Sequence, residues 1–189
     1  MRIAISGPSG SGKTTLAAEL AARLGIRHIE IDALHHGPNW SEAPADVLRE
    51  RVAAATEGDG WVTDATYHSK LGDFVLERAE TFVWLDLPPR LTFPRLLRRT
   101  YVRKKHNVVL WHGNVEASWR EQIAYLFWPA LKASFRNRRE YPRRLARHPH
   151  LRVHRLRSDD DVRAFVQSIQ AMPEMFGSSN AVARGEFRL

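Results

Sequence analysis

The chain has 189 residues, a length typical of one domain, and 43% of them are hydrophobic, which is enough for a sizeable core. It has no cysteine, which excludes a disulfide framework and thiol chemistry, and no apolar run approaches the roughly 18 residues of a membrane span. Since the first residues already have the pattern of a strand, we expect no signal peptide and a cytoplasmic protein.

The formal net charge of +8 is unevenly distributed. Residues 90–157 hold 18 Lys and Arg against three acidic residues, so this segment carries the whole basic excess. Such a segment attracts polyanions, either nucleotide phosphates or nucleic acid. A solvated, arginine-rich helical face would have the same composition, and that interpretation stays open.

A glycine-rich motif comes first along the chain. A short apolar strand, residues 2–6, leads into Gly7-Pro8-Ser9-Gly10-Ser11-Gly12-Lys13-Thr14, which matches the phosphate-binding loop pattern G-x-x-x-x-G-K-[ST] at every fixed position. Leu16, Leu20 and Leu24 then recur at helical spacing until Gly25. Strand, loop and helix are the context that this motif requires, so the sequence predicts binding of ATP, or GTP, together with Mg²⁺.

The residue types of the loop fit that chemistry. Glycines let backbone N–H groups approach phosphate oxygens, and the helix N-terminus adds unpaired donors with a partial positive charge. We expect Lys13 to reach the β- and γ-phosphates and the Thr14 hydroxyl to coordinate Mg²⁺. The predicted nucleotide-binding residues of the loop are Gly7, Ser9, Gly10, Ser11, Gly12, Lys13, Thr14 and Thr15.

Beyond the loop, apolar runs alternate with helical patterns. Further strands are predicted at residues 28–31, 61–63, 81–87 and 151–156, and helices at residues 44–56, 71–79, 88–103, around 119–135 and 158–169. We expect Pro94 to kink its helix unless the helix starts there. Five strands alternating with helices predict a three-layer α/β fold of P-loop NTPase type with a parallel sheet. We expect one domain, residues 1–172, and a disordered tail, residues 173–189.

Two acidic residues follow predicted strands. Asp32 is expected at the end of the second strand and Asp64 at the end of the third. Ligands of parallel sheets bind at the carboxyl ends of the strands, which places both carboxylates beside the phosphate loop. Asp64 is a candidate to hold Mg²⁺ through a water, with an ordinary turn residue as the alternative.

The order of these features resembles the adenylate-kinase-type nucleoside and nucleotide kinases, and within that group most resembles the small bacterial topology modulation proteins. The resemblance covers about residues 1–172. It rests on the loop and on four shorter stretches, Ile31-Asp32-Ala33-Leu34-His35 with Trp40, Trp61-Val62-Thr63-Asp64-Ala65-Thr66-Tyr67, Val83-Trp84-Leu85-Asp86-Leu87-Pro88 running to Arg98-Arg99, and Leu156-Arg157-Ser158. It implies an adenylate-kinase-like core, a substrate flap at about residues 33–60 and an arginine-rich lid at about residues 98–140.

The resemblance also implies roles for single residues. Asp32 would orient an acceptor hydroxyl or accept its proton, although a turn or helix-capping aspartate is the alternative. Arg98 and Arg99 would clamp the transferring phosphate, and Arg99 and Arg157 would contact the nucleotide. With Asp32, an acceptor pocket would contain His35, Trp40 and Tyr67, of which Trp40 could equally pack the flap.

Two departures concern the acceptor. The glycine that usually follows the aspartate of the third strand is absent after Asp64, and the stretch between Asp32 and Trp61 is short for a full nucleoside-monophosphate clamp. The donor side of the site is unaffected by either departure.

The sequence therefore predicts an ATP-dependent phosphotransferase acting on a small-molecule, nucleoside or nucleotide acceptor. The alternatives are a nucleic-acid-associated NTPase or regulator and a nucleotide-dependent binding module without turnover. No nucleic-acid-binding motif is recognisable, so we expect any contact with nucleic acid to be weak, non-specific and sensitive to salt.

Overall fold

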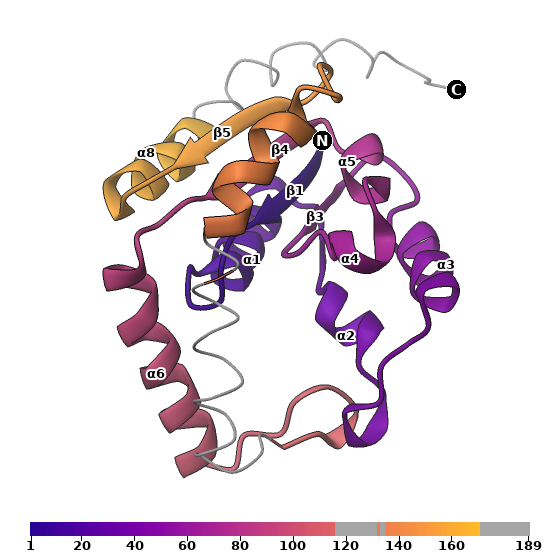
Figure 1. The fold of residues 1–189 in the computed structure, drawn as a ribbon, viewed down its shortest axis with the longest axis vertical. Coiled ribbons are helices and arrows are strands. Elements are labelled where there is room, and N and C mark those ends of the chain that lie inside the picture. The colour runs from indigo at the N-terminus through magenta and orange to yellow at the C-terminus, as the bar shows by residue number, and fades with distance from the viewer. Residues whose placement is uncertain (116–131, 133–134, 171–189) are drawn as a thin grey trace, which may run out of the picture.

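The computed structural model describes residues 1–115, 132 and 135–170, and its centre is a sheet of five strands (Figure 1). The strands are β1 (Arg2–Ser6), β2 (Arg27–Ile29), β3 (Trp61–Thr63), β4 (Thr81–Leu85) and β5 (Arg152–Leu156). All pair in parallel, in the order β2-β3-β1-β4-β5. The predicted fold class is thereby confirmed. Because the strands are parallel, their carboxyl ends all lie at one edge of the sheet, where ligands of such sheets bind.

Helices connect the strands. The α-helices are α1 (Lys13–Leu24), α2 (Ile31–His35), α3 (Ala45–Ala55), α4 (His68–Leu71), α5 (Phe74–Arg78), α6 (Pro89–Lys105) and α8 (Asp159–Gln170), and two 3₁₀ turns are η1 (Pro38–Trp40) and η2 (Trp111–Gly113). Residues 135–145 are also helical. In the described part of the chain, no helix combines the length and the apolar character needed to cross a bilayer.

The sheet has a separate hydrophobic core on each face, because successive strand residues point to opposite sides. On one face Ile3, Ile5 and Val83 pack under the apolar sides of α1 and α8. On the other face Phe82 and Trp84 pack under α3, α4, α5 and the segment 135–145. The result is the expected three-layer arrangement, with the central strands buried on both sides.

Two predicted boundaries were wrong. The second strand ends at Ile29, and Ile31–His35 forms α2, so Asp32 lies in the first turn of a short helix instead of at a strand end. The predicted helix at residues 71–79 is two helices, α4 and α5, because Gly72 takes a positive φ of 60° that ends the first one.

The proline in α6 does not end that helix. Pro94 lies inside α6, five residues after its first residue. The backbone bond that a proline lacks would go to the carbonyl of Arg90, in the first turn, so little of the helix is lost.

Part of the predicted helix around 119–135 and the whole predicted tail lie outside the described residues. Phe135, the last residue of that predicted helix, begins the helical segment 135–145 and is 59% exposed. The buried aromatic residue of that segment is instead Tyr141, whose ring packs edge-on against Phe82 and Trp84.

The start of α8 at Asp159 agrees with the predicted helix at residues 158–169, and Ser158 caps it. The Ser158 hydroxyl accepts a hydrogen bond from the backbone N–H of Asp161, and the Asp161 carboxylate accepts one from the backbone N–H of Ser158. This reciprocal pair is a capping box, in which two otherwise unpaired N–H groups are satisfied.

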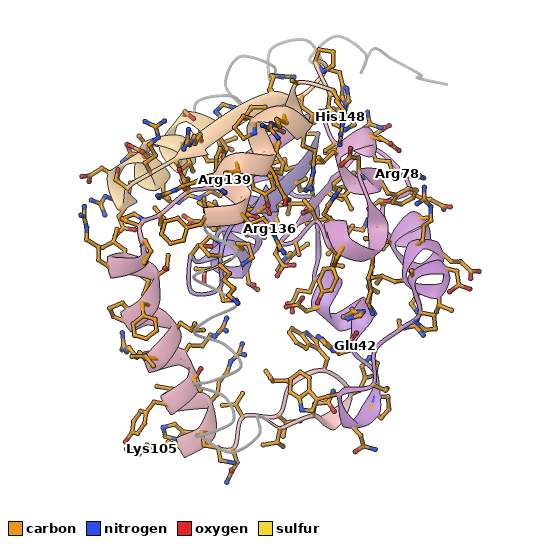
Figure 2. The ribbon with its side chains drawn as sticks, viewed as in Figure 1. Glu42, Arg78, Lys105, Arg136, Arg139 and His148 are labelled. Carbon is orange, nitrogen blue, oxygen red and sulfur yellow. The ribbon has the colours of Figure 1, made fainter. Side chains whose placement is uncertain are left out.

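A charge cluster joins the end of the helical segment 135–145, and the turn after it, to Asp73, which precedes α5. The cluster lies at the end of the sheet away from the phosphate loop. Asp73 lies 2.6 Å from Arg147 Nη2, 3.2 Å from His148 Nε2 and 3.6 Å from Arg144 Nε. Figure 2 shows His148 at the opposite end of the molecule from Lys105. Burial raises the pKa of Asp73, but the His148 contact and the hydrogen bond from Arg147 outweigh it, so this pKa lies below its usual value.

We predict that Asp73→Asn lowers the free energy of unfolding at pH 7 by about 2–4 kcal/mol, because it leaves neighbouring cations without their carboxylate. A lowered carboxyl pKa stabilises the fold above the unfolded-state value near 3.9 and ceases to do so as pH falls through the folded-state value. Urea unfolding should therefore show a difference from the parent protein that shrinks below about pH 4. The exposed Asp59→Asn is the matched control, and equal effects of the two substitutions would contradict the assignment.

Candidate active site

The phosphate loop lies at the carboxyl end of β1 and packs against α6. Gly10 and Gly12 have φ values of 80° and 89°, a backbone region that residues other than glycine rarely adopt. A Cβ atom on Gly10 would lie 2.3 Å from the carbonyl oxygen of Thr92 in α6, whereas one on Gly12 would meet no atom of the described residues within 4 Å. Gly10 thus permits close contact between the loop and α6.

Lys13 is folded over this loop. Its Nζ donates a hydrogen bond to the carbonyl oxygen of Pro8 at 3.1 Å. Burial lowers the pKa of Lys13 to about 8, although the charges of Asp32 and Asp64 raise it, and the charge of Arg99 lowers it further. Lys13 therefore lies within electrostatic reach of Asp32 in α2, Asp64 after β3 and Arg99 in α6.

Thr14 and Asp64, the predicted metal residues, are in direct contact. The Thr14 hydroxyl donates to Asp64 Oδ2 at 2.7 Å, and Asp64 is only 3% exposed. The other carboxylate oxygen, Oδ1, is buried without a hydrogen-bond partner among the described residues. A buried carboxylate oxygen in that state needs a donor or a cation, so this pair fits Mg²⁺ held beside a nucleotide.

Burial raises the pKa of Asp64, the Thr14 hydrogen bond lowers it, and the charge of Asp32 raises it again. His28 Nε2 lies 3.9 Å from Asp64 Oδ2 and provides a nearby ring nitrogen. The carboxylate is therefore crowded by other acids, an arrangement that a bound cation would relieve.

Asp32 is held by Tyr67. The Tyr67 hydroxyl donates to Asp32 Oδ1 at 2.6 Å, which leaves Oδ2 for another partner. Burial raises the pKa of Tyr67, and the charge of Asp32 and this hydrogen bond raise it further, so Tyr67 remains a donor. Tyr67 also has a positive φ of 42°, a costly conformation that often accompanies functional sites.

The predicted arginines differ in position. Arg98 and Arg99 are both exposed on α6, and the charge of Arg99 lowers the pKa of Lys13. Arg157 is exposed after β5, where its backbone N–H donates to Asp161. Figure 2 shows Arg136 in the first turn of the segment 135–145, on the side of the sheet where the strands end.

His35 and Trp40, the remaining acceptor-side predictions, belong to an aromatic cluster. The His35 ring lies 4.8 Å from that of Tyr67 and 4.6 Å from that of His36. Trp40 packs edge-on against His36 with ring centroids 5.4 Å apart, and it is 36% exposed. Trp40 therefore packs on His36, and its backbone N–H and ring N–H donate hydrogen bonds to the segment described next.

Sequence reasoning missed the residues that cover this cluster. Asn114 accepts from the backbone N–H of Trp40 and donates to the carbonyl of Gly37, and the Trp40 ring donates to the carbonyl of Val115. Trp111 donates to Glu30 Oε2 at 2.8 Å. These contacts join positions more than 70 residues apart, and the only sequence signal was a tryptophan in a weakly periodic stretch.

The family follows from comparison with known proteins. A family model described as an AAA domain (AAA_18) matches residues 3–121, which include the phosphate loop, β1 to β4 and α6. The chain belongs to this family.

Curated relatives are nucleotide kinases. The chain is 26% identical over 113 residues to the cytidylate kinase of Pyrococcus horikoshii, an alignment covering 51% of this chain and 56% of the relative. It is 29% identical over 136 residues to the cytidylate kinase of Natronomonas pharaonis, covering 62% and 69%. The chain thus spans little more than half of the first relative's length.

Solved structures share the fold. Deoxyadenosine kinase from M. mycoides with bound dATP has a TM-score of 0.53 at 14% identity, covering 89% of this chain and 99% of that one. Shikimate kinase from Bacteroides thetaiotaomicron has a TM-score of 0.51 at 16% identity, covering 92% and 98%. At these identities the likeness establishes the fold alone.

We predict that Asp64→Asn weakens binding of Mg-ATP by about 10- to 100-fold, the usual effect of removing a carboxylate that supports a metal site. Binding of ATP in EDTA should change little, since the loop and Lys13 are untouched. Calorimetric titrations with Mg²⁺ and with EDTA separate these cases, with Asp59→Asn as the control. An equal loss in both titrations would show that Asp64 supports the loop and has no part in metal binding.

Proposed function

We propose that the protein is an ATP-dependent kinase that transfers the γ-phosphoryl group of Mg-ATP to a small-molecule acceptor. The observation that carries this proposal is the convergence on Lys13: the loop, the Thr14–Asp64 pair, Asp32 and Arg99 all lie around one cation. Donor-side and acceptor-side groups of a phosphotransferase thus meet at the same edge of the sheet. The kinase activities of the relatives support the same reaction class.

On the donor side, loop N–H groups and Lys13 would hold the β- and γ-phosphates. Thr14 and Asp64 would hold Mg²⁺, which supplies charge neutralisation when bound. Arg99 would stabilise the charge that develops on the transferring group. On the acceptor side, Asp32, fixed by Tyr67, would align the nucleophile.

The alternative of a nucleic-acid-associated NTPase, as in the topology modulation proteins, is less well supported. Several arginines of the basic segment are paired with acids of other elements. Arg138 and Arg155 bind Asp86, which is 5% exposed, and Arg95 binds Asp159. Such arginines help to hold the fold together and offer less charge to a polyanion.

The proposal is tested by incubating the protein with Mg-ATP and a panel of nucleosides, nucleotides, sugars and other small alcohols. Release of ADP above the level without acceptor, with a phosphorylated product in the mass spectrum, would support it. Lys13→Ala should abolish most of this turnover. Binding of Mg-ATP without turnover on any member of the panel would favour a nucleotide-dependent binding module instead.

We predict that Asp32→Asn lowers kcat by roughly 10²- to 10⁴-fold, the range typical of a lost general base. The affinity for Mg-ATP should stay within about threefold, since the role belongs to the transition state. Steady-state kinetics and calorimetry measure the two quantities. Asp46→Asn, an exposed substitution in the first turn of α3, is the control. An unchanged kcat for Asp32→Asn would move the role to another residue, Asp64 first.

A further inference from the structure

The segment 110–115 forms one wall of the acceptor side. Figure 1 shows α6 extending away from the sheet and the chain after it returning toward η1. Besides the contacts of Asn114 and Trp111, the His112 ring nitrogen lies 3.4 Å from the carbonyl oxygen of Ala33 in α2. The Trp111 and His36 rings are nearly parallel, 17° apart, with centroids separated by 6.3 Å. Flat aromatic surfaces from two distant segments therefore flank α2, which carries Asp32.

Among the described residues, Asp32 lies near two acids, Glu30 and Asp64, and near one buried cation, Lys13 of the phosphate loop. Glu30 precedes Asp32 in the chain, and both influence the pKa of Asp64 at the end of β3. Glu42 lies on the same side and already binds Lys70, at 2.9 Å. A phosphate or carboxylate placed beside these acids would be repelled, whereas an uncharged molecule would not.

The polar groups of the aromatic cluster suit uncharged hydroxyls. Burial lowers the pKa of His35, and the charges of Lys70 and His36 lower it further, so its ring is neutral at pH 7. The Nδ1 atoms of His35 and His36 are buried without a hydrogen-bond partner among the described residues. Unpaired buried nitrogens next to an aromatic surface indicate a ligand that offers hydroxyl or ring-nitrogen partners.

We propose that the acceptor is an uncharged hydroxyl compound with a flat ring, of the nucleoside class, that binds between the Asp32–Tyr67 pair and the Trp111–His36 aromatic surface. We expect nucleoside monophosphates and carboxylates to bind there less well, because the carboxylates of Glu30 and Asp32 would repel them. This inference rests on the proposed kinase function and narrows its acceptor.

The chemistry requires a carboxylate where Asp32 lies. The acceptor oxygen forms a bond to the γ-phosphorus of ATP while the bond from that phosphorus to the β–γ bridging oxygen breaks. ADP leaves with that electron pair, and the hydroxyl proton passes to Asp32. A phosphate acceptor has an ionised oxygen and needs no such proton transfer, so the Asp32–Tyr67 pair matches an alcohol.

The first test uses matched substrates with the whole protein and Mg-ATP. Each of adenosine, cytidine, guanosine and thymidine is compared with its own 5′-monophosphate. Shikimate and gluconate serve as hydroxyl acceptors that also carry a carboxylate. We expect kcat/KM for the best nucleoside to exceed that for its monophosphate at least about tenfold, a difference equivalent to roughly 1.4 kcal/mol. Preference for a monophosphate or a carboxylate would overturn this inference and leave the kinase proposal intact. Turnover of no acceptor would overturn both.

The second test uses two variants on the nucleoside that the first test selects. Trp111→Leu should raise KM for the nucleoside about tenfold without changing KM for ATP, since stacking of a base on an aromatic ring is worth about 1–3 kcal/mol. Glu30→Gln should reduce the preference for nucleoside over monophosphate by roughly three- to tenfold, because one repelling charge is removed. Glu80→Gln is the matched control. It removes the same charge just before the amino end of β4, whereas Glu30 follows the carboxyl end of β2, and Glu80 pairs with Arg2 there. Equal effects of Glu30→Gln and Glu80→Gln, or an unchanged KM for the nucleoside in Trp111→Leu, would contradict the proposed placement.

Discussion

The hydrogen bond from Thr14 to Asp64 joins the phosphate loop to the neighbouring strand, and the geometry of the donor side depends on it. β1 and β3 are adjacent and parallel, so the residues that follow both strands meet at the same edge. The loop then turns into α1 through Gly12, which directs the helix N-terminus and the Thr14 hydroxyl toward Asp64. Because this carboxylate is buried, the bond is made in a low-dielectric setting, where its orientation is well defined.

The proposed acceptor side is organised by a longer-range contact. Asn39 and Trp40 in η1 and His112 in η2 all have positive φ values, 55°, 57° and 56°. This backbone state is costly above all for Trp40, because Asn and His adopt it more readily, and it persists where surrounding contacts fix it. The hydrogen bonds of Asn114 and Trp40 supply those contacts, so η1 and the segment 110–115 stabilise each other's conformation.

The sequence predicted the parts of the site that are local. The phosphate loop, its strand and its helix are contiguous, and buried parallel strands have an apolar pattern that is easily recognised. The boundary at Ile29 was missed because His28-Ile29-Glu30-Ile31 alternates polar and apolar residues like a strand, while Ile31 in fact begins a helix buried against the core. The pairing of Asp32 with Tyr67 was not foreseen, although both residues were expected near the acceptor.

The contacts of Trp111 and Asn114 could not be predicted in the same way. They depend on how far α6 extends and where the chain after it returns, which is set by tertiary packing and leaves no periodic pattern. The same holds for the cluster around Asp73, where Arg144 of the helical segment and Arg147 of the turn after it meet a carboxylate between two short helices. Local patterns fix elements, whereas the partners of a loop residue are determined only once the elements are packed.

The charges of the site come both from the predicted local motifs and from the tertiary contacts. Asp64 is buried and is crowded by Asp32 and Glu30, while Lys13 is buried beside them with a lowered pKa. Nucleotide phosphates alone would add negative charge to this group of acids, against which the described residues offer Lys13, Arg99 and the loop N–H groups. A divalent cation beside Thr14 and Asp64 would offset both the phosphates and the crowded carboxylates. The arrangement of acids thus favours the metal complex of the nucleotide over the free nucleotide, and it disfavours a second anion on the acceptor side for the same reason.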